Sequence, residues 1–276
     1  MPCYLLVDNG SKQPLATLRL RRLAVELSTY TGKTIHPVSL QHADSIPADQ
    51  LGGAPAHTFS DFLQQQLQQG ENHFIALPLF FGDSRALTSF IPDEVAKLRV
   101  HYPELKVQLA EVTYPLPDGD PRLAEIVHEH IQQTLEQIGA EAEANTRVVL
   151  VDHGSPSAQI TAVRQGIAQT VVERFGLDLD QACMERREGE QYDFNGELLQ
   201  EWLRRQAEQG YDSVIIAMLF FLPGRHAGPC GDVEEICESV VKDYPQLRYT
   251  ITPLISEHPL LLQILQQRMA SIEAGA

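Results

Sequence analysis

The sequence lacks several features that would place it in a familiar class of protein. Its 276 residues contain no apolar run near the roughly 18 residues that a membrane span needs. Basic residues are few, since 21 Lys and Arg stand against 37 Asp and Glu, and the net charge of −16 disfavours nucleic acid and anionic membranes as partners. The four cysteines have no CxxC spacing, so we expect free thiols in a reducing compartment.

What the sequence has in quantity is hydrophobic residues, at 43%, which is enough for a sizeable core. The opening stretch "MPCYLLVDNG" has no basic region and leads directly into a strand pattern. We therefore expect no signal peptide, and a cytoplasmic protein.

Short β-branched runs alternate with amphipathic stretches along the whole chain. Strands are expected near 4–9, 34–40, 73–80, 105–112, 146–152, 178–184, 212–220 and 247–252. Helices are expected near 13–31, 57–69, 86–101, 120–138, 157–174, 194–209, 230–243 and 258–273. Nearly continuous apolar strands between helices are typical of parallel sheets covered on both faces, so the sequence predicts an α/β protein of doubly wound form.

The chain also repeats itself. Residues 5–11, "LLVDNGS", match residues 149–155, "VLVDHGS", and "LFF" occurs at both 79–81 and 219–221. Further on, "DPRLAEIV" at 120–127 parallels "HPLLLQIL" at 258–265. Three matches in the same order predict two domains of one fold, at 1–140 and 145–276, joined by the polar connector 138–147. The alternative is that βα units simply resemble one another.

Three histidines of the second half are predicted at or just beyond the carboxyl ends of strands: His153, His226 and His258. Their counterparts in the first half are Asn9, Ala86 and Asp120. Imidazole suits divalent first-row metals and is a general base near neutral pH. His153 and His226 both have glycine neighbours, so we expect them to form a joint site. For His258, which precedes Pro259 at a helix start, a role as a capping residue and a role as a ligand are equally well supported.

Other polar residues near these turns have weaker signals. Glu185 follows the second strand of this half and is either functional or a solvated loop carboxylate; its counterpart is His42. The nearby Cys230 and Cys237 are either metal ligands or buried structural thiols. Pro229 and Gly231 interrupt the helix that would place His226 and Cys230 on one face, so we expect buried structural thiols.

The turns "DNGSK" and "DHGSPS" place Gly-Ser before a helix, where backbone N–H groups can bind an anion. Neither the GxxxxGK[ST] nor the GxGxxG pattern is present, and no nucleophile elbow is found, so we expect neither ATP nor a nicotinamide cofactor.

Taken together, these motifs resemble the class II tetrapyrrole chelatases of the CbiX or sirohydrochlorin cobalt- and ferrochelatase type. "LVDHGS" is similar to the family's strand ending in "HGS", "AMLFFLPGRHAG" to its "PLFL", Gly and His segment, and "EHPLL" to its last helix start. Weaker versions recur as "LVDNGS", "LPLFFGDSRA" and "DPRLAEI". The resemblance implies two tandem chelatase-like domains, each a four-stranded parallel sheet with helices on both faces, in pseudo-two-fold relation around a central cleft.

The resemblance also implies an activity. Such proteins are lyases that insert Co²⁺ or Fe²⁺ into sirohydrochlorin or a related tetrapyrrole without ATP, in cobalamin or siroheme biosynthesis; the ligand types also suit Ni²⁺. By position, His153 and His226 bind the metal and assist proton removal, and Glu185 is a third ligand or proton relay. The first half, with Asn9 and Ala86, is not expected to bind metal.

A polycarboxylate substrate needs cationic partners, and a solvated surface charge is the alternative for each of these: Arg186, Arg187 and Arg225. The other expected substrate contacts are Ser155, Asn9 and Ser11. A metal- or tetrapyrrole-binding carrier and a purely structural or regulatory α/β protein stay open as alternatives. Because the halves are fused, we expect a monomer rather than a homodimer.

Overall fold

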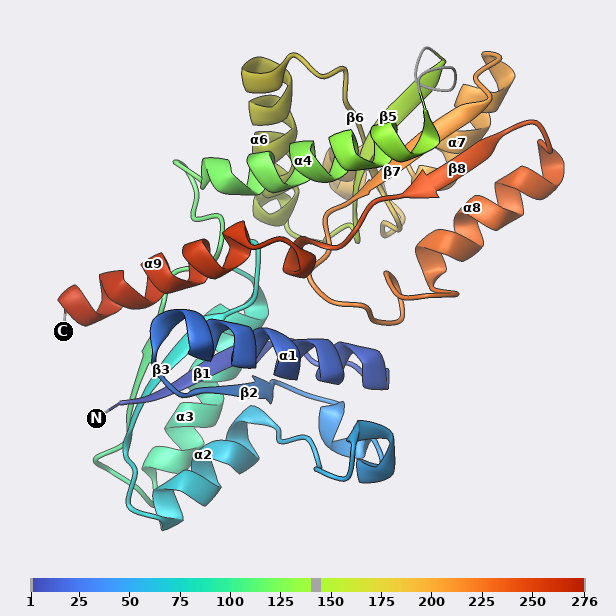
Figure 1. Cartoon of the computed structure of the whole chain (residues 1–276). Coiled ribbons are helices and arrows are strands. Elements are labelled where there is room, and N and C mark those ends of the chain that lie inside the picture. The colour runs from blue at the N-terminus through green and yellow to red at the C-terminus, as the bar shows by residue number, and fades with distance from the viewer. Residues whose placement is uncertain (1, 140–144, 276) are drawn as a thin grey trace. The chain divides into compact units, whose positions relative to one another are not determined.

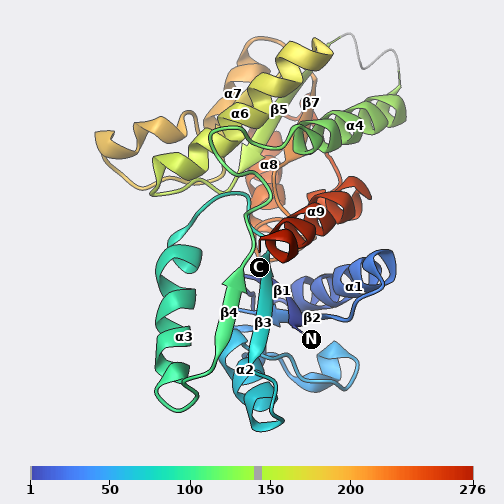
Figure 2. The same cartoon turned by 90° about the vertical axis from the view of Figure 1, so that its left-hand side faces the viewer.

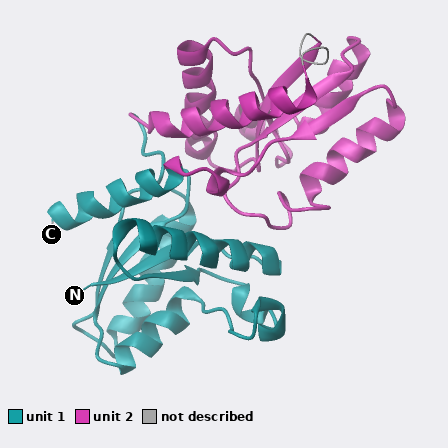
Figure 3. Cartoon of the chain, viewed as in Figure 1, with its two compact units in different colours: residues 1–117, 261–276 teal, residues 118–260 magenta. Residues whose placement is uncertain are grey.

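The computed structural model describes residues 2–139 and 145–275, so residues 140–144 of the expected connector lie outside the described residues. The chain divides into two compact units (Figure 3). Unit 1 contains residues 1–117 and 261–276, and unit 2 contains residues 118–260.

The sheet of unit 1 has four parallel strands in the order β2-β1-β3-β4. They are β1 (Cys3–Asp8), β2 (Ile35–Ser39), β3 (His73–Pro78) and β4 (Lys106–Leu109). Helices α2 and α3 pack on one face, where Val7, Phe59 and Phe74 are buried together. Helices α1 and α9 lie on the other face (Figures 1 and 2). The four helices are α1 (Pro14–Thr31), α2 (Phe59–Gln68), α3 (Ile91–Arg99) and α9 (Leu260–Ala274).

The sheet of unit 2 repeats this order as β6-β5-β7-β8, again all parallel. Its strands are β5 (Thr146–Asp152), β6 (Asp180–Cys183), β7 (Ser213–Met218) and β8 (Arg248–Ile251). Helix α4 packs against α6 and β7, while α7 and α8 cover the face that buries Trp202. These helices are α4 (Pro121–Ile138), α6 (Ala158–Phe175), α7 (Leu199–Glu208) and α8 (Asp232–Asp243). The predicted fold class, two tandem four-stranded parallel sheets with helices, is confirmed.

The expected strands and helices all form, with local differences at their ends. The helix expected at 86–101 begins as a π-helical turn, η3 (Ala86–Phe90). The helix expected at 194–209 begins only at Leu199, because the preceding residues form a 3-10 helix, η4 (Glu190–Asn195), before an extended Leu198. Short 3-10 helices also occur at η1 (Ala43–Ser45), η2 (Ala48–Leu51) and η5 (Ile255–Glu257).

The compact units do not follow the ends of the sequence repeat. Helix α4 closes the first repeat in sequence but belongs to unit 2, and all but the first residue of α9 belongs to unit 1. The domain ranges 1–140 and 145–276 stay a prediction about the repeat, and the compact units differ from these ranges by one helix each. No helix within the described residues is both long and apolar enough to cross a membrane.

Candidate metal and substrate site

The structure brings His153 and His226 together at the carboxyl edge of the unit 2 sheet. His153 directly follows β5, and His226 lies in the loop that follows the neighbouring strand β7. The ring centroids are 4.5 Å apart and the ring planes cross at 80°. This is the edge at which open α/β sheets bind their ligands.

Both rings are oriented through their Nδ1 atoms. The Nδ1 atom of His226 lies 2.6 Å from Oδ2 of Asp232, the first residue of α8. The Nδ1 atom of His153 lies 3.0 Å from the carbonyl oxygen of Gly154. A carboxylate and a carbonyl can only accept, so we assign the proton of each neutral ring to Nδ1. The lone pair of each Nε2 atom is then available to a metal ion.

Glu185 lies beside this pair. Its Oε1 atom is 3.5 Å from Nε2 of His153, and its backbone N–H donates to the carbonyl of His153 at 3.1 Å. Strand β6, which Glu185 follows, pairs directly with β5, and this places the carboxylate at the same edge. Among residues 2–139 and 145–275, no group of three His, Cys, Asp or Glu side chains is arranged to hold a metal ion.

A glycine makes the turn after His153 possible. Gly154 has φ of +86°, and a Cβ atom there would lie 1.9 Å from the carbonyl oxygen of Glu185. Gly10 repeats this in unit 1, with φ of +88° and a distance of 1.8 Å to the carbonyl oxygen of Gln41. In both halves the turn therefore touches the backbone of the loop after the neighbouring strand, which only glycine permits.

We expected anion binding at the turn "DHGSPS" that follows β5. Its N–H groups have partners within the protein. The N–H of Gly154 donates to Asp152, that of Ser155 to Asn195 at 2.9 Å, and that of Ser157 to the hydroxyl of Ser155. Sequence reasoning missed Asn195, which is fully buried. Its only signal was the turn-forming pair Asn-Gly at 195–196.

The three candidate arginines differ in the contacts that their guanidinium groups make within the protein. Arg186 donates to Asp193 and to the carbonyl of Gly196, each at 3.2 Å. The guanidinium of Arg187 lies 5.8 Å from the ring centroid of Tyr192. Arg225 has a side chain that is 76% exposed, with Nε 3.5 Å from Asp232. Arg225 and Arg187 are thus the better placed to bind an added anion.

His258 has a capping role. Its Nδ1 atom accepts from the N–H of Leu260 at 3.2 Å, and its Nε2 atom lies 2.8 Å from Glu129 of α4. Asp120, its counterpart in the repeat, likewise accepts from the N–H two residues on, at Arg122. The structure therefore supports the capping alternative for His258.

The two cysteines near His226 differ. Cys237 is buried, as expected, and burial raises the pKa of its thiol to about 12. The expectation was wrong for Cys230, which is exposed. It lies in the turn between Pro229 and Gly231 with φ of +55°, and its N–H donates to Glu234 at 2.6 Å. The turn lies at the surface, so no hydrophobic core is within reach of this thiol.

The corresponding edge of unit 1 has neither histidine. Asn9 follows β1, and Ala86 begins η3. Ser11 closes the same kind of turn as Ser155, accepting from the N–H of Gln13 at 3.1 Å. His42, with φ of +71°, lines a cavity of about 530 Å³ that Lys12 and other polar residues share.

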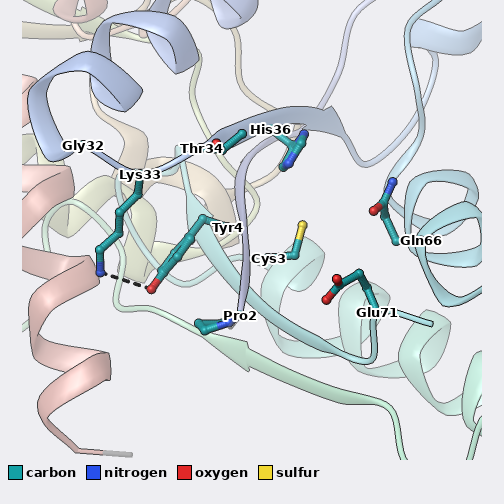
Figure 4. Close-up of a pocket in the computed structure, with 9 residues that line it drawn as sticks. All are labelled: Pro2, Cys3, Tyr4, Gly32, Lys33, Thr34, His36, Gln66 and Glu71. Atoms are coloured by element: carbon teal, nitrogen blue, oxygen red, sulfur yellow. Dashed lines mark hydrogen bonds between the residues drawn. The ribbon is translucent and has the colours of Figure 1, made fainter. Parts of the chain in front are cut away.

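A second cavity of unit 1, of about 510 Å³, lies at the opposite edge of the sheet (Figure 4). Its lining includes Cys3, Tyr4 and His36, from the starts of β1 and β2. Lys33 donates to the hydroxyl of Tyr4 at 3.1 Å on one side of it. None of the candidate site residues lines this cavity.

Comparison with known proteins gives a family. A family model named CbiX matches residues 3–134 and again residues 147–272. The chain belongs to the CbiX family. The two CbiX matches correspond to the two halves of the repeat. No curated protein sequence matches the chain.

Solved structures share the fold of this CbiX-family chain. "SirB from Bacillus subtilis with Fe3+" is 17% identical with a TM-score of 0.68, over 98% of this chain and 95% of that chain. The sirohydrochlorin chelatase SirB from Bacillus subtilis subspecies spizizenii in complex with cobalt is 16% identical, with a TM-score of 0.65 over 97% and 94%. CbiX, described as the terminal enzyme for biosynthesis of siroheme in denitrifying bacteria, is 14% identical, with a TM-score of 0.58 over 98% of each chain.

Proposed function

We propose that this protein inserts a divalent metal ion, Co²⁺ or Fe²⁺, into sirohydrochlorin or a related tetrapyrrole without ATP. The observation that carries the proposal is the pair His153 and His226, whose rings lie 4.5 Å apart with both Nδ1 atoms engaged. Family membership supports it, as do neighbours described as a sirohydrochlorin chelatase with cobalt and as a terminal enzyme for siroheme biosynthesis.

The chemistry needs an open and weak metal site. The ion must shed water, bind the protein briefly and then pass to the four nitrogens of the ring. Two imidazoles supply borderline ligands that suit Co²⁺ and Fe²⁺ and leave most coordination positions free. The net charge of −16 favours the approach of cations.

Two pyrrole N–H protons must leave as the metal enters the ring. A neutral imidazole is a suitable acceptor near pH 7 once it has released its metal. Glu185, 3.5 Å from Nε2 of His153 and with a side chain 64% exposed, can pass such a proton to water. We assign Glu185 the role of a proton relay or third ligand.

The carboxylates of the tetrapyrrole need cationic partners. Among the described residues, neither Arg225 nor Arg187 has its guanidinium bound bidentately. Arg225 directly precedes His226, and Arg187 lies two residues after Glu185. Fork-shaped pairing of guanidinium with carboxylate gives both affinity and orientation. Arg186 donates to Asp193 and Gly196 of the same loop. We therefore assign it a structural role in addition to substrate binding.

One site per chain follows from the repeat, since Asn9 and Ala86 stand where the second half has histidines. A fused pair of halves supports a monomer. All four cysteines are free, which supports a reducing compartment such as the cytoplasm.

The test is the absorbance change of anaerobic sirohydrochlorin mixed with Co²⁺ or Fe²⁺, with and without protein. We expect faster insertion with protein, and loss of that acceleration in the double variant His153→Ala/His226→Ala. His101→Ala, which removes an exposed histidine of unit 1, is the matched control and should behave as the unaltered protein. Full activity of the double variant would contradict the site. Binding of ring and metal without faster insertion would indicate a carrier instead.

A further inference from the structure

A buried arginine lies behind the turn that carries His153. The side chain of Arg164, from α6, is only 2% exposed. Its Nη1 atom donates to Asp152 at 2.5 Å and to the carbonyl of Ala182 at 3.0 Å, and its Nη2 atom donates to the carbonyl of Asn195 at 2.6 Å. A buried guanidinium is tolerated only when such partners replace water, so this position is held by the partners around it.

Asn195 completes the arrangement from the other side. Its Oδ1 atom accepts from the N–H of Ser155 at 2.9 Å and from the hydroxyl of Thr161 at 3.1 Å. Its Nδ2 atom donates to the carbonyls of Ser155 at 2.9 Å and Tyr192 at 3.0 Å. All four hydrogen-bonding positions of the amide are used, and both polar groups of the Ser155 backbone are bound. We call Asp152, Ser155, Thr161, Arg164 and Asn195 the Arg164 network.

The first half of the chain is an internal control for this network. The offset of 144 that relates the two turns aligns Arg164 with Leu20, which is buried in the apolar core of unit 1. It aligns Asp152 with Asp8, whose Oδ1 atom is buried without a hydrogen-bond partner among the described residues. Unit 1 therefore forms the same sheet and the same turn with leucine in place of the arginine behind the turn. The fold does not require the network, and the half that has both histidines is the half that has it.

The network acts on two candidate groups at once. His153 stands between Asp152 and Ser155, which the network holds from either side. Glu185 is the first residue of the loop 185–197, and Asn195 lies near the end of that loop. The N–H of Glu185 donates to the carbonyl of His153. The network thus links the turn to the loop 185–197 and fixes how the ring and the carboxylate face each other before any ligand arrives.

We propose that Arg164 and Asn195 are positioning residues for the metal site. They hold the His153 turn and the loop 185–197 as one rigid piece, and they touch neither metal nor substrate themselves. This inference rests on the proposed function, in which His153 receives the ion.

The test uses Co²⁺ alone as the probe, with affinity from calorimetry and hydrogen exchange of the loop 185–197 as separate readouts. The double variant Asp152→Asn/Arg164→Leu removes the buried charge pair without leaving a bare carboxylate. Asn195→Ala removes the amide. We expect a loss of Co²⁺ affinity of about 10- to 100-fold in each, as for removal of groups that orient metal ligands, and faster exchange of the loop.

Two further variants separate positioning from general stability. Arg147→Leu removes an arginine that pairs with Asp178 and Asp180 at the other end of β5, and it should leave Co²⁺ affinity unchanged. Thr161→Val removes one hydrogen bond to Asn195 in a nearly isosteric way. It should lower the affinity by about 2- to 10-fold in a folded protein. If Asp152→Asn/Arg164→Leu and Asn195→Ala prevent folding, the Co²⁺ affinity of Thr161→Val still tests the positioning role.

Folded variants with unaltered Co²⁺ affinity and unaltered loop exchange would overturn the inference. If the unaltered protein binds no Co²⁺, the proposed function fails, while loop exchange still tests whether the network holds the loop. Faster exchange limited to the network variants supports that part, and exchange equal to that of Arg147→Leu overturns it.

Discussion

The Oδ2 atom of Asp232 lies 2.6 Å from the Nδ1 atom of His226. The carboxylate lies at the first position of α8. Two backbone hydrogen bonds close the loop that joins the two residues, from the N–H of Asp232 to the carbonyl of Arg225 and from that of Val233 to His226. The histidine is thus oriented by the helix that follows it.

Replacing Asp232 by alanine should weaken metal binding by about 10- to 100-fold, because the ring loses the acceptor that fixes its tautomer and orientation. Calorimetric titration with Co²⁺ measures this. Glu235→Ala is the matched control, since it removes an exposed acidic residue from the same first turn of α8. Within the described residues the side chain of His226 interacts instead with Asp232 and His153. Equal losses in the two variants would mean that only helix-end charge matters.

Alanine at Gly154 should distort the turn of the metal site, since its Cβ atom would fall 1.9 Å from the carbonyl oxygen of Glu185. Alanine at Gly10 meets the same obstacle in unit 1, at 1.8 Å from Gln41. Each is expected to cost more than about 1 kcal/mol of stability. Only Gly154→Ala should also lower Co²⁺ affinity, and a similar loss of affinity in Gly10→Ala would show that unit 1 contributes to metal binding.

The carboxyl group of Asp8 should make stability fall as the pH rises. Burial raises its pKa from 3.8 to about 6, so the folded state holds the proton more tightly than the unfolded chain does. Its contribution is most favourable below pH 3.8 and is lost as the pH rises through about 6. The shift corresponds to about 3 kcal/mol at neutral pH.

The variant Asp8→Asn removes this dependence. It should raise the free energy of unfolding by up to about 3 kcal/mol at pH 7.5 and change it little at pH 4. Urea unfolding followed by circular dichroism at both pH values gives the comparison. The counterpart Asp152→Asn should instead destabilise the protein, by about 3–5 kcal/mol, because it strands the buried charge of Arg164. A gain from Asp152→Asn as well would show that Arg164 does not need its carboxylate.

Trp202 should stabilise unit 2 through both its ring and its N–H. The side chain is fully buried in α7, and Nε1 donates to Asp180 of β6 at 2.9 Å. Trp202→Phe keeps most of the packing and loses the hydrogen bond, so we expect a loss of about 1–3 kcal/mol. Tyr244→Phe, which removes an exposed hydrogen bond to Glu208, should change stability by less than about 0.5 kcal/mol. Thermal unfolding followed by circular dichroism ranks the two.

Much of the fold follows from local pattern. Apolar runs such as 148–151 and 214–217 predict buried parallel strands, because they are short, rich in β-branched residues and separated by amphipathic helices. The repeated "VDNGS" and "VDHGS" turns fix where two strands end, and the common edge of a parallel sheet then implies that residues following neighbouring strands meet. His153, Glu185 and His226 were candidates for that reason.

Contacts between distant segments had no such signal. Asn195 binds the backbone of Ser155 forty positions earlier, and the only sequence signal at Asn195 is the turn-forming pair Asn-Gly at 195–196. Local sequence left two alternatives open for His258, and the surroundings make it a cap. For Cys230 local sequence predicted a buried thiol, and the surroundings leave it exposed.

The sequence by itself determined the order of strands and helices, the repeat and the half that has the histidines, because these depend on side-chain periodicity and identity. Only the tertiary structure decided which helix joins which unit, that His226 is bound by Asp232, and that Arg164 and Asn195 lie behind His153. Those features depend on which backbone and side-chain groups meet once water is excluded, and a buried polar group must then find its partners wherever the fold supplies them.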